Sequence, residues 1–88
     1  MALIFAPDSF VGLQNHDSRR ILNKIEWLWD NRDVVQHLQL RGNLNGYFKK
    51  RLGEYRIIYY YDHDNDEMKI LKVGHRDSIY TDAANELG

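Results

Sequence analysis

The chain has 88 residues, no cysteine, and 12 lysines and arginines against 13 aspartates and glutamates, which gives a formal net charge of −1. We expect one α+β domain over residues 1–88, because this length fits a single domain and 43% hydrophobic residues is typical of folded proteins. The absence of cysteine excludes disulfides and thiolate chemistry, and it fits the reducing cytoplasm, where we expect the protein to act. No apolar run approaches the ~20 residues of a membrane span, and no secretory signal is expected. The net charge argues against a general nucleic-acid binder.

The first half of the chain predicts a short strand followed by helices. The apolar run 2–5 is typical of a strand, and Asp8 or Ser9 can cap a short helix after it. A longer helix is expected over residues 18–31, and residues 33–40 are expected to add one helical turn. The apolar face of the longer helix follows from the spacing of Ile21, Leu22, Ile25, Leu28 and Trp29.

The second half predicts an antiparallel meander of β-rich segments. Its three strands are expected over residues 47–52, 55–61 and 67–73. Gly74 is expected to end the last strand, and a final helical turn is expected around residues 77–87. A short N-terminal strand, two helices and this meander predict an α+β fold with the helices on one face of the sheet. The other face is expected to be open to solvent or to a partner.

The charge is unevenly distributed, with five basic side chains and one acidic side chain in residues 41–60 and acidic flanks on both sides. Lys49 and Arg51 are two apart on a predicted strand, so both leave the same sheet face, and pairing across the turn brings Arg56 near Arg51. Three clustered cations repel one another, and an anion such as a phosphate would give a reason to gather them. The alternative is a solvated edge on which lysine discourages aggregation.

A second group of polar side chains follows the last predicted strand. His75 and Arg76 come directly after Gly74, and Tyr80 follows four residues later. Histidine transfers protons readily near neutral pH, and tyrosine can stack on a base. The alternative is a surface histidine, an arginine paired with Asp77 and a tyrosine that packs the tail.

Two stretches of the sequence, QLRGNLNGYFKKRLGEYRIIYYYD and ILKVGHRDSIY, carry a resemblance to a known family. Basic residues alternate on an aromatic strand, a Gly-acidic-Tyr-Arg turn leads into an apolar-aromatic strand, and a later strand ends in Val-Gly-His-Arg with a tyrosine beyond it. This pattern resembles the RelE/ParE toxin superfamily, and specifically its RelE-type branch. With the N-terminal strand and helices, the resemblance covers nearly the whole chain.

The resemblance implies a toxin of a type II toxin–antitoxin system. Such a toxin would cleave messenger RNA, usually in the ribosomal A site, and a cognate antitoxin would neutralise it. The ribose 2′-OH would attack the neighbouring phosphate and leave a 2′,3′-cyclic phosphate and a 5′-OH, without metal or cofactor and with no role for a membrane. The family's catalytic positions fall on Lys49, Arg51, Arg56, Arg76 and Tyr80.

The chemistry of this reaction predicts roles for these side chains. Arg56 would stabilise the phosphorane, Tyr80 would stack on the target base, and Arg76 would lie near the leaving oxygen. Arginine keeps its proton, so Lys49 and His75 are the candidates for the base, with His75 the better titrating group. Two further cations of the basic segment, Arg41 and Lys50, are predicted to bind the RNA backbone.

Other functions remain open at this point. A ParE-like toxin would share the fold and inhibit DNA gyrase by protein contact, and a degenerate member would only bind its antitoxin. The acidic run 62–67 lacks the glycine and glutamate of an EF-hand loop, and the four histidines have no zinc-ligand spacing. A net charge of −1 also leaves ribosome dependence open, because phosphate contacts dominate docking to RNA.

Overall fold

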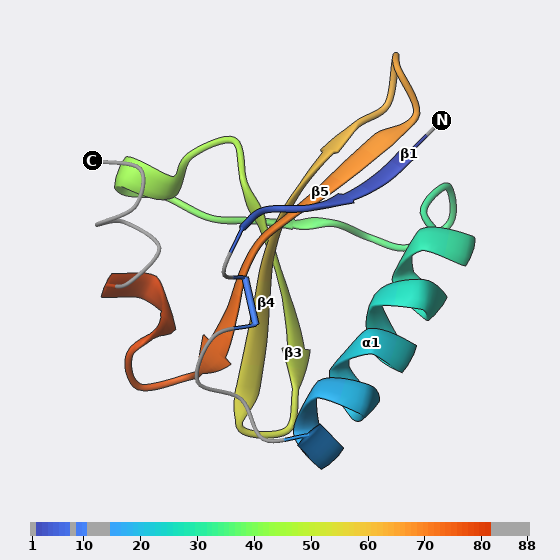
Figure 1. Cartoon of the computed structure of the whole chain (residues 1–88). Coiled ribbons are helices and arrows are strands. Elements are labelled where there is room, and N and C mark those ends of the chain that lie inside the picture. The colour runs from blue at the N-terminus through green and yellow to red at the C-terminus, as the bar shows by residue number, and fades with distance from the viewer. Residues whose placement is uncertain (1, 8, 11–14, 82–88) are drawn as a thin grey trace.

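The structure is a computed structural model that describes residues 2–7, 9–10 and 15–81 (Figure 1). Within these residues a five-stranded sheet has the order β1-β5-β4-β3-β2, with one long helix beside it. The elements are β1 (Ala2–Phe5), α1 (Asn15–Asp30), β2 (Leu38–Gln39), the 3₁₀ turn η1 (Gly42–Leu44), β3 (Phe48–Leu52), β4 (Tyr55–Asp62) and β5 (Glu67–His75).

The strands β3, β4 and β5 form the expected antiparallel meander, and β1 adds to it in parallel beside β5. The expected α+β class is therefore confirmed. Gly74 was expected to end the last strand, but β5 continues to His75. A Cβ at Gly74 would lie 3.0 Å from Cδ1 of Ile79, so this glycine leaves room for a side chain that packs on the sheet.

The helix α1 packs its apolar stripe on one face of the sheet. Ile21, Ile25 and Leu28 are fully buried there, and alternate residues of β4 such as Ile57 and Tyr59 meet them. This packing stabilises both elements, because each fully buried aliphatic side chain contributes about 1.5–3 kcal/mol relative to an exposed one. The helix begins three residues earlier than expected, at Asn15.

The opposite face of the sheet is covered at its centre, where the sequence predicted an open surface. Figure 1 shows η1 and the helical residues 79–81 on the side of the sheet away from α1. They complete a second small core on Ile58 of β4 and on Leu71, the extra residue at a bulge in β5. This cover removes the apolar side chains of Ile58 and Leu71 from water, which stabilises the fold.

Two other predicted elements differ. Residues 33–40 form a turn and then β2 rather than a helical turn, because Leu38 and Gln39 pair with β3. Of the short helix expected after Asp8, only Ser9 and Phe10 are described, and they form a turn; the rest of it lies outside the described residues. The final helical turn is present at residues 79–81, and the rest of its predicted range lies outside the described residues.

Candidate functional site

Three cationic side chains gather on the sheet face that points away from α1. Arg51 on β3 pairs directly opposite Arg56 on β4, and Lys49 lies opposite Ile58 on the same face. Ile58 belongs to the core on that face, whereas Ile57 packs against α1, and this alternation decides the side on which the cations lie. The predicted convergence of Lys49, Arg51 and Arg56 is confirmed.

The guanidinium of Arg56 is held by the tight turn between β3 and β4. Its Nη1 donates to the carbonyl oxygens of Gly53 at 2.9 Å and Tyr55 at 2.8 Å. These bonds fix the orientation of the fork and leave its other N–H groups available to an anion. Among the described residues, no carboxylate forms an ion pair with Arg56, Arg51 or Lys49. The positive charge of this face is therefore uncompensated within the described part of the chain.

Glu54, at the same turn, ties the end of β5 to the hairpin. Its carbonyl accepts from the amide of Arg76 at 2.9 Å, and its Oε2 lies 3.2 Å from Nε of Arg76 and 3.5 Å from Nε2 of His75. The amide of Asp77 donates to Nδ1 of His75 at 3.2 Å, so neutral His75 carries its proton on Nε2, the nitrogen that faces Glu54. His75 pairs with Tyr55 and so stands on the α1 side of the sheet, at its end.

Tyr80 and Arg41 lie beside the cations from two other segments. Tyr80 packs on the second core next to Ile58, on the face that carries Lys49. Arg41 is exposed, and with Lys49 it lines a hollow of about 530 Å³ beside β2. Both residues therefore border the predicted site.

Lys50, like His75, lies on the α1 side of the sheet, away from Lys49, Arg51 and Arg56. Its Nζ lies 5.4 Å from the ring centre of Trp27 on α1, and Lys24 lies over the same ring at 3.9 Å. Lys50 follows Lys49 on β3, and successive side chains of a strand point to opposite faces. The structure thus separates Lys50 from Lys49, Arg51 and Arg56.

The cationic face also carries side chains that were not among the predicted site residues. Tyr47 and Tyr60 contact each other there, with ring centres 6.2 Å apart, and Lys69 pairs opposite Tyr60 on β5. The two-residue spacing of Arg56, Ile58 and Tyr60 in the sequence predicts that all three share one face, but it predicts no role for Tyr60 in the site.

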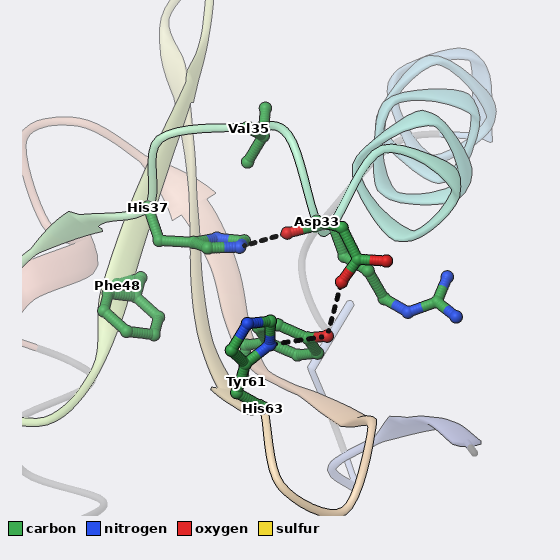
Figure 2. A pocket seen from close by; sticks show the side chains of 7 residues that line it. Asp33, Val35, His37, Phe48, Tyr61 and His63 are labelled. Atoms are coloured by element: carbon green, nitrogen blue, oxygen red, sulfur yellow. Dashed lines mark hydrogen bonds between the residues drawn. The ribbon is translucent and has the colours of Figure 1, made fainter.

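A second hollow, of about 320 Å³, lies at the other end of the sheet (Figure 2). Its lining includes the rings of His37, Phe48 and Tyr61, and the ring centres of His37 and Phe48 are 5.3 Å apart. Nε2 of His37 donates to the carbonyl oxygen of Arg32 at 2.9 Å, so Nδ1 of the neutral ring accepts from the hydroxyl of Tyr59 at 2.6 Å. His37 thus links the segment after α1 to the sheet.

Charged groups close this hollow toward the turn between β4 and β5. The guanidinium of Arg32 binds Asp66, with Nη2 2.9 Å from Oδ2, and this bond holds the pKa of the Asp66 carboxyl below its usual value. The Tyr61 hydroxyl lies 3.2 Å from Asp66 and 3.4 Å from Asp33, and burial together with these contacts raises its pKa. These groups hold one another, and none lies on the cationic face.

The geometry above agrees with a comparison of the chain with protein-family models. Residues 8–80 match the model described as the ParE toxin of type II toxin-antitoxin systems, parDE. This chain belongs to the ParE toxin family. It is a type II toxin of the RelE/ParE superfamily, as its sequence motifs predicted.

Solved structures of RelE toxins resemble the toxin over most of its length. The toxin–antitoxin complex RelBE2 of Mycobacterium tuberculosis contains a chain that is 26% identical, with a TM-score of 0.62, over 85% of this toxin and 96% of that chain. The isolated Escherichia coli RelE toxin is 18% identical, with a TM-score of 0.65, over 98% of this toxin and 97% of that chain. A chain of the RelB–RelE complex of Methanococcus jannaschii is 23% identical, with a TM-score of 0.62, over 89% of this toxin and 95% of that chain. A search of curated protein sequences finds no match.

Two further observations concern metal ligands and membrane-spanning helices in the described residues. Within the described residues, no three His, Asp or Glu side chains gather as a metal site requires. In the same part of the chain, no helix has the length and apolarity needed to cross a membrane.

Proposed function

We propose that the toxin is an endoribonuclease that cleaves mRNA by attack of a ribose 2′-OH on the adjacent phosphate. The observation that carries this proposal is the pair Arg51 and Arg56, directly opposite each other on an uncompensated cationic face. Like charges opposite each other in a sheet destabilise it, and a bound phosphate removes that cost. The extra charge of a phosphorane strengthens the same contacts in the transition state.

In this proposal Arg56 is the main electrostatic group. Its Nη1 is already committed to the carbonyl oxygens of Gly53 and Tyr55, so its remaining donors need little reorganisation when the phosphorane forms. Arg51 contributes a second guanidinium from β3, and Tyr80 stacks on the target base from the second core. Arg41 and Lys50 bind backbone phosphates on either side of β3.

The proton transfers are assigned by location. Lys49 shares the face of Arg51 and Arg56, so as the neutral amine it is better placed than His75 to take the proton of the 2′-OH. His75 and Arg76 stand at the end of β5 beside Glu54, and there they serve the leaving 5′-oxygen. To act as the acid, His75 must first take up a proton on Nδ1, which lies 3.4 Å from Oδ2 of Asp77, and the imidazolium then donates its Nε2 proton to the leaving oxygen.

A cognate antitoxin and the ribosome complete the proposal. The Mycobacterium tuberculosis relative was solved as a toxin–antitoxin complex, and this supports a protein antitoxin for the toxin described above. The local positive charge of residues 41–60 supports a grip on mRNA, and the ribosomal A site presents that mRNA in single-stranded form.

Inhibition of DNA gyrase is the second candidate function, because the matching family model is that of ParE. A gyrase inhibitor would act by protein contact, so its activity would not depend on the alignment of Lys49, Arg51 and Arg56 over a phosphate. A supercoiling assay with purified gyrase tests this candidate directly.

The deciding experiment is a translation reaction supplied with the toxin, followed by mapping of mRNA 5′ ends. Wild type and Lys24→Ala, a cation on α1 away from the site, should cut equally, and Arg56→Ala should lose at least 100-fold in rate. Cuts in register with the reading frame would support action on the ribosome. Full cutting by a folded Arg56→Ala protein would refute the assignment, and inhibition of gyrase without any cutting would support the second candidate.

A further inference from the structure

The cationic face does not end at Lys49, because two tyrosines continue it along the sheet. Tyr60 lies in the middle of β4 and yet is 40% exposed, and its ring meets that of Tyr47 at 61°. Tyr47 packs on the second core, whereas Tyr60 is outside both core clusters. Covering the core therefore explains the position of Tyr47 and leaves the exposed ring of Tyr60 without a structural role.

Lysines border this pair of rings on both sides. Lys69 is exposed on β5 directly opposite Tyr60, and Lys49 follows Tyr47 at the two-residue spacing of one sheet face. The backbone carbonyl of Tyr47 accepts from the amide of Leu40 at 2.9 Å, and Leu40 lines the same hollow as Arg41 and Lys49. Ile58, between Arg56 and Tyr60 on β4, is buried under the second core, so the cations and rings of this face adjoin one another along β3, in the order Arg51, Lys49 and Tyr47.

An acidic pair ends this surface one step beyond the tyrosines. Asp62 and Glu67 lie opposite each other on β4 and β5, at the same two-residue spacing from Tyr60 and Lys69. Hydrogen bonds from the Asn65 side chain and from nearby backbone amides hold the pKa of the Asp62 carboxyl below its usual value, so it stays ionised. A phosphate chain that crosses the cationic face would be repelled there, and Tyr60 is the last aromatic ring before that boundary.

We propose that Tyr47, Tyr60 and Lys69 form a second nucleotide subsite, which stacks an unpaired RNA base away from the cleaved phosphate. The subsite rests on the proposed RNA cleavage, and it extends the path of the RNA in one direction, from the hairpin end toward the Asp62–Glu67 pair. Arg56 and Tyr60 are four positions apart on the strand, about 13 Å, so the base that stacks at Tyr60 belongs to another nucleotide than the one at Arg56. Aromatic rings beside cations are the usual means of holding single-stranded RNA.

The test measures binding of a fluorescent 12-nucleotide 2′-O-methyl RNA, which has no free 2′-OH and cannot be cleaved by the proposed reaction. Tyr60→Ala should weaken binding about 5- to 100-fold, and Tyr60→Phe, which keeps the ring, should bind like wild type. Phe5→Ala removes an equally exposed aromatic ring on β1, on the opposite sheet face from Lys69, and serves as the matched control, with unchanged binding. Lys69→Ala should lower the slope of log affinity against log salt by about 1, and Tyr60→Ala should leave that slope unchanged.

The outcomes separate this subsite from the proposed function. If the toxin cuts mRNA and Tyr60→Ala binds the oligonucleotide as wild type does, the subsite is refuted and the nuclease stands. If Tyr60→Phe is as weak as Tyr60→Ala, the hydroxyl rather than the ring makes the contact, and stacking is refuted. If wild type neither binds this RNA nor cuts mRNA, both proposals fail.

Discussion

Arg51 on β3 lies directly opposite Arg56 on β4, five positions later in the chain, across the two-residue turn of Gly53 and Glu54. Directly opposed like charges destabilise a sheet, and no carboxylate in the described part of the chain pairs with either guanidinium. The fold therefore carries an electrostatic cost at the place where an anionic ligand would bind.

The first prediction separates the effect of the Arg51–Arg56 repulsion on stability from the role of these charges in cleavage. Arg51→Thr removes one charge and places a β-branched residue on a strand, so the free energy of unfolding should rise by about 0.2–1 kcal/mol. The same change should lower the rate of mRNA cleavage about tenfold or more. Urea denaturation and a cleavage assay on one preparation measure the two effects. Arg51→Lys keeps the charge and should not gain stability; a gain equal to that of threonine would contradict the electrostatic cause.

The second prediction concerns Gly74 and Ile79. A Cβ at Gly74 would come within 3.0 Å of Cδ1 of Ile79, which is fully buried, so Gly74→Ala should lower the free energy of unfolding by about 1–3 kcal/mol. Because Tyr80 follows Ile79, cleavage should fall as well. The double variant with Ile79→Val lacks the crowded Cδ1 and should recover part of the loss. If the two changes are simply additive in urea denaturation, the crowding is not the cause.

The sequence predicted the strands accurately where the alternation of side chains between the two sheet faces determines the structure. The alternation along β4 correctly separated Arg56 and Ile58 from the residues that face α1, because register in a sheet with one buried face leaves little freedom. The bulge at Leu71 and the two residues of β2 could not be predicted, because both depend on partners distant in sequence. The role of His37 was missed for the same reason, since its partner Tyr59 is 22 residues away.

The third prediction is a pH dependence of stability that arises from Asp66. Its hydrogen bond and ion pair with Arg32 lower the pKa of the folded carboxyl, so the stabilisation is complete above the pKa of the unfolded chain, about 4, and is lost as the pH falls through the folded value. Asp66 has φ of +51°, which asparagine tolerates, so Asp66→Asn changes mainly the charge. The difference in Tm between wild type and this variant should be constant from pH 5 to 7 and shrink below about pH 4.

A neighbour in the same turn gives the control for this measurement. Asp64 is exposed and forms no ion pair with any described residue, so Asp64→Asn should show a nearly constant difference from wild type over the same range. A difference for Asp66→Asn that does not change down to pH 2.5 would contradict the contribution of the Arg32–Asp66 pair.

The last prediction concerns the hydrogen bond between Tyr59 and His37. Tyr59 is 1% exposed, and burial raises its pKa, so its hydroxyl stays protonated and donates to Nδ1 of His37 at 2.6 Å. Tyr59→Phe leaves that nitrogen without its donor, and the free energy of unfolding should fall by about 1–3 kcal/mol in urea denaturation. In a His37→Ala background the same change should cost less, because no acceptor remains to be left unpaired. Equal costs in the two backgrounds would show that the hydroxyl stabilises the fold through another partner. Cleavage of mRNA should be preserved in folded Tyr59→Phe, because this bond lies on the α1 side of the sheet, away from the cationic face.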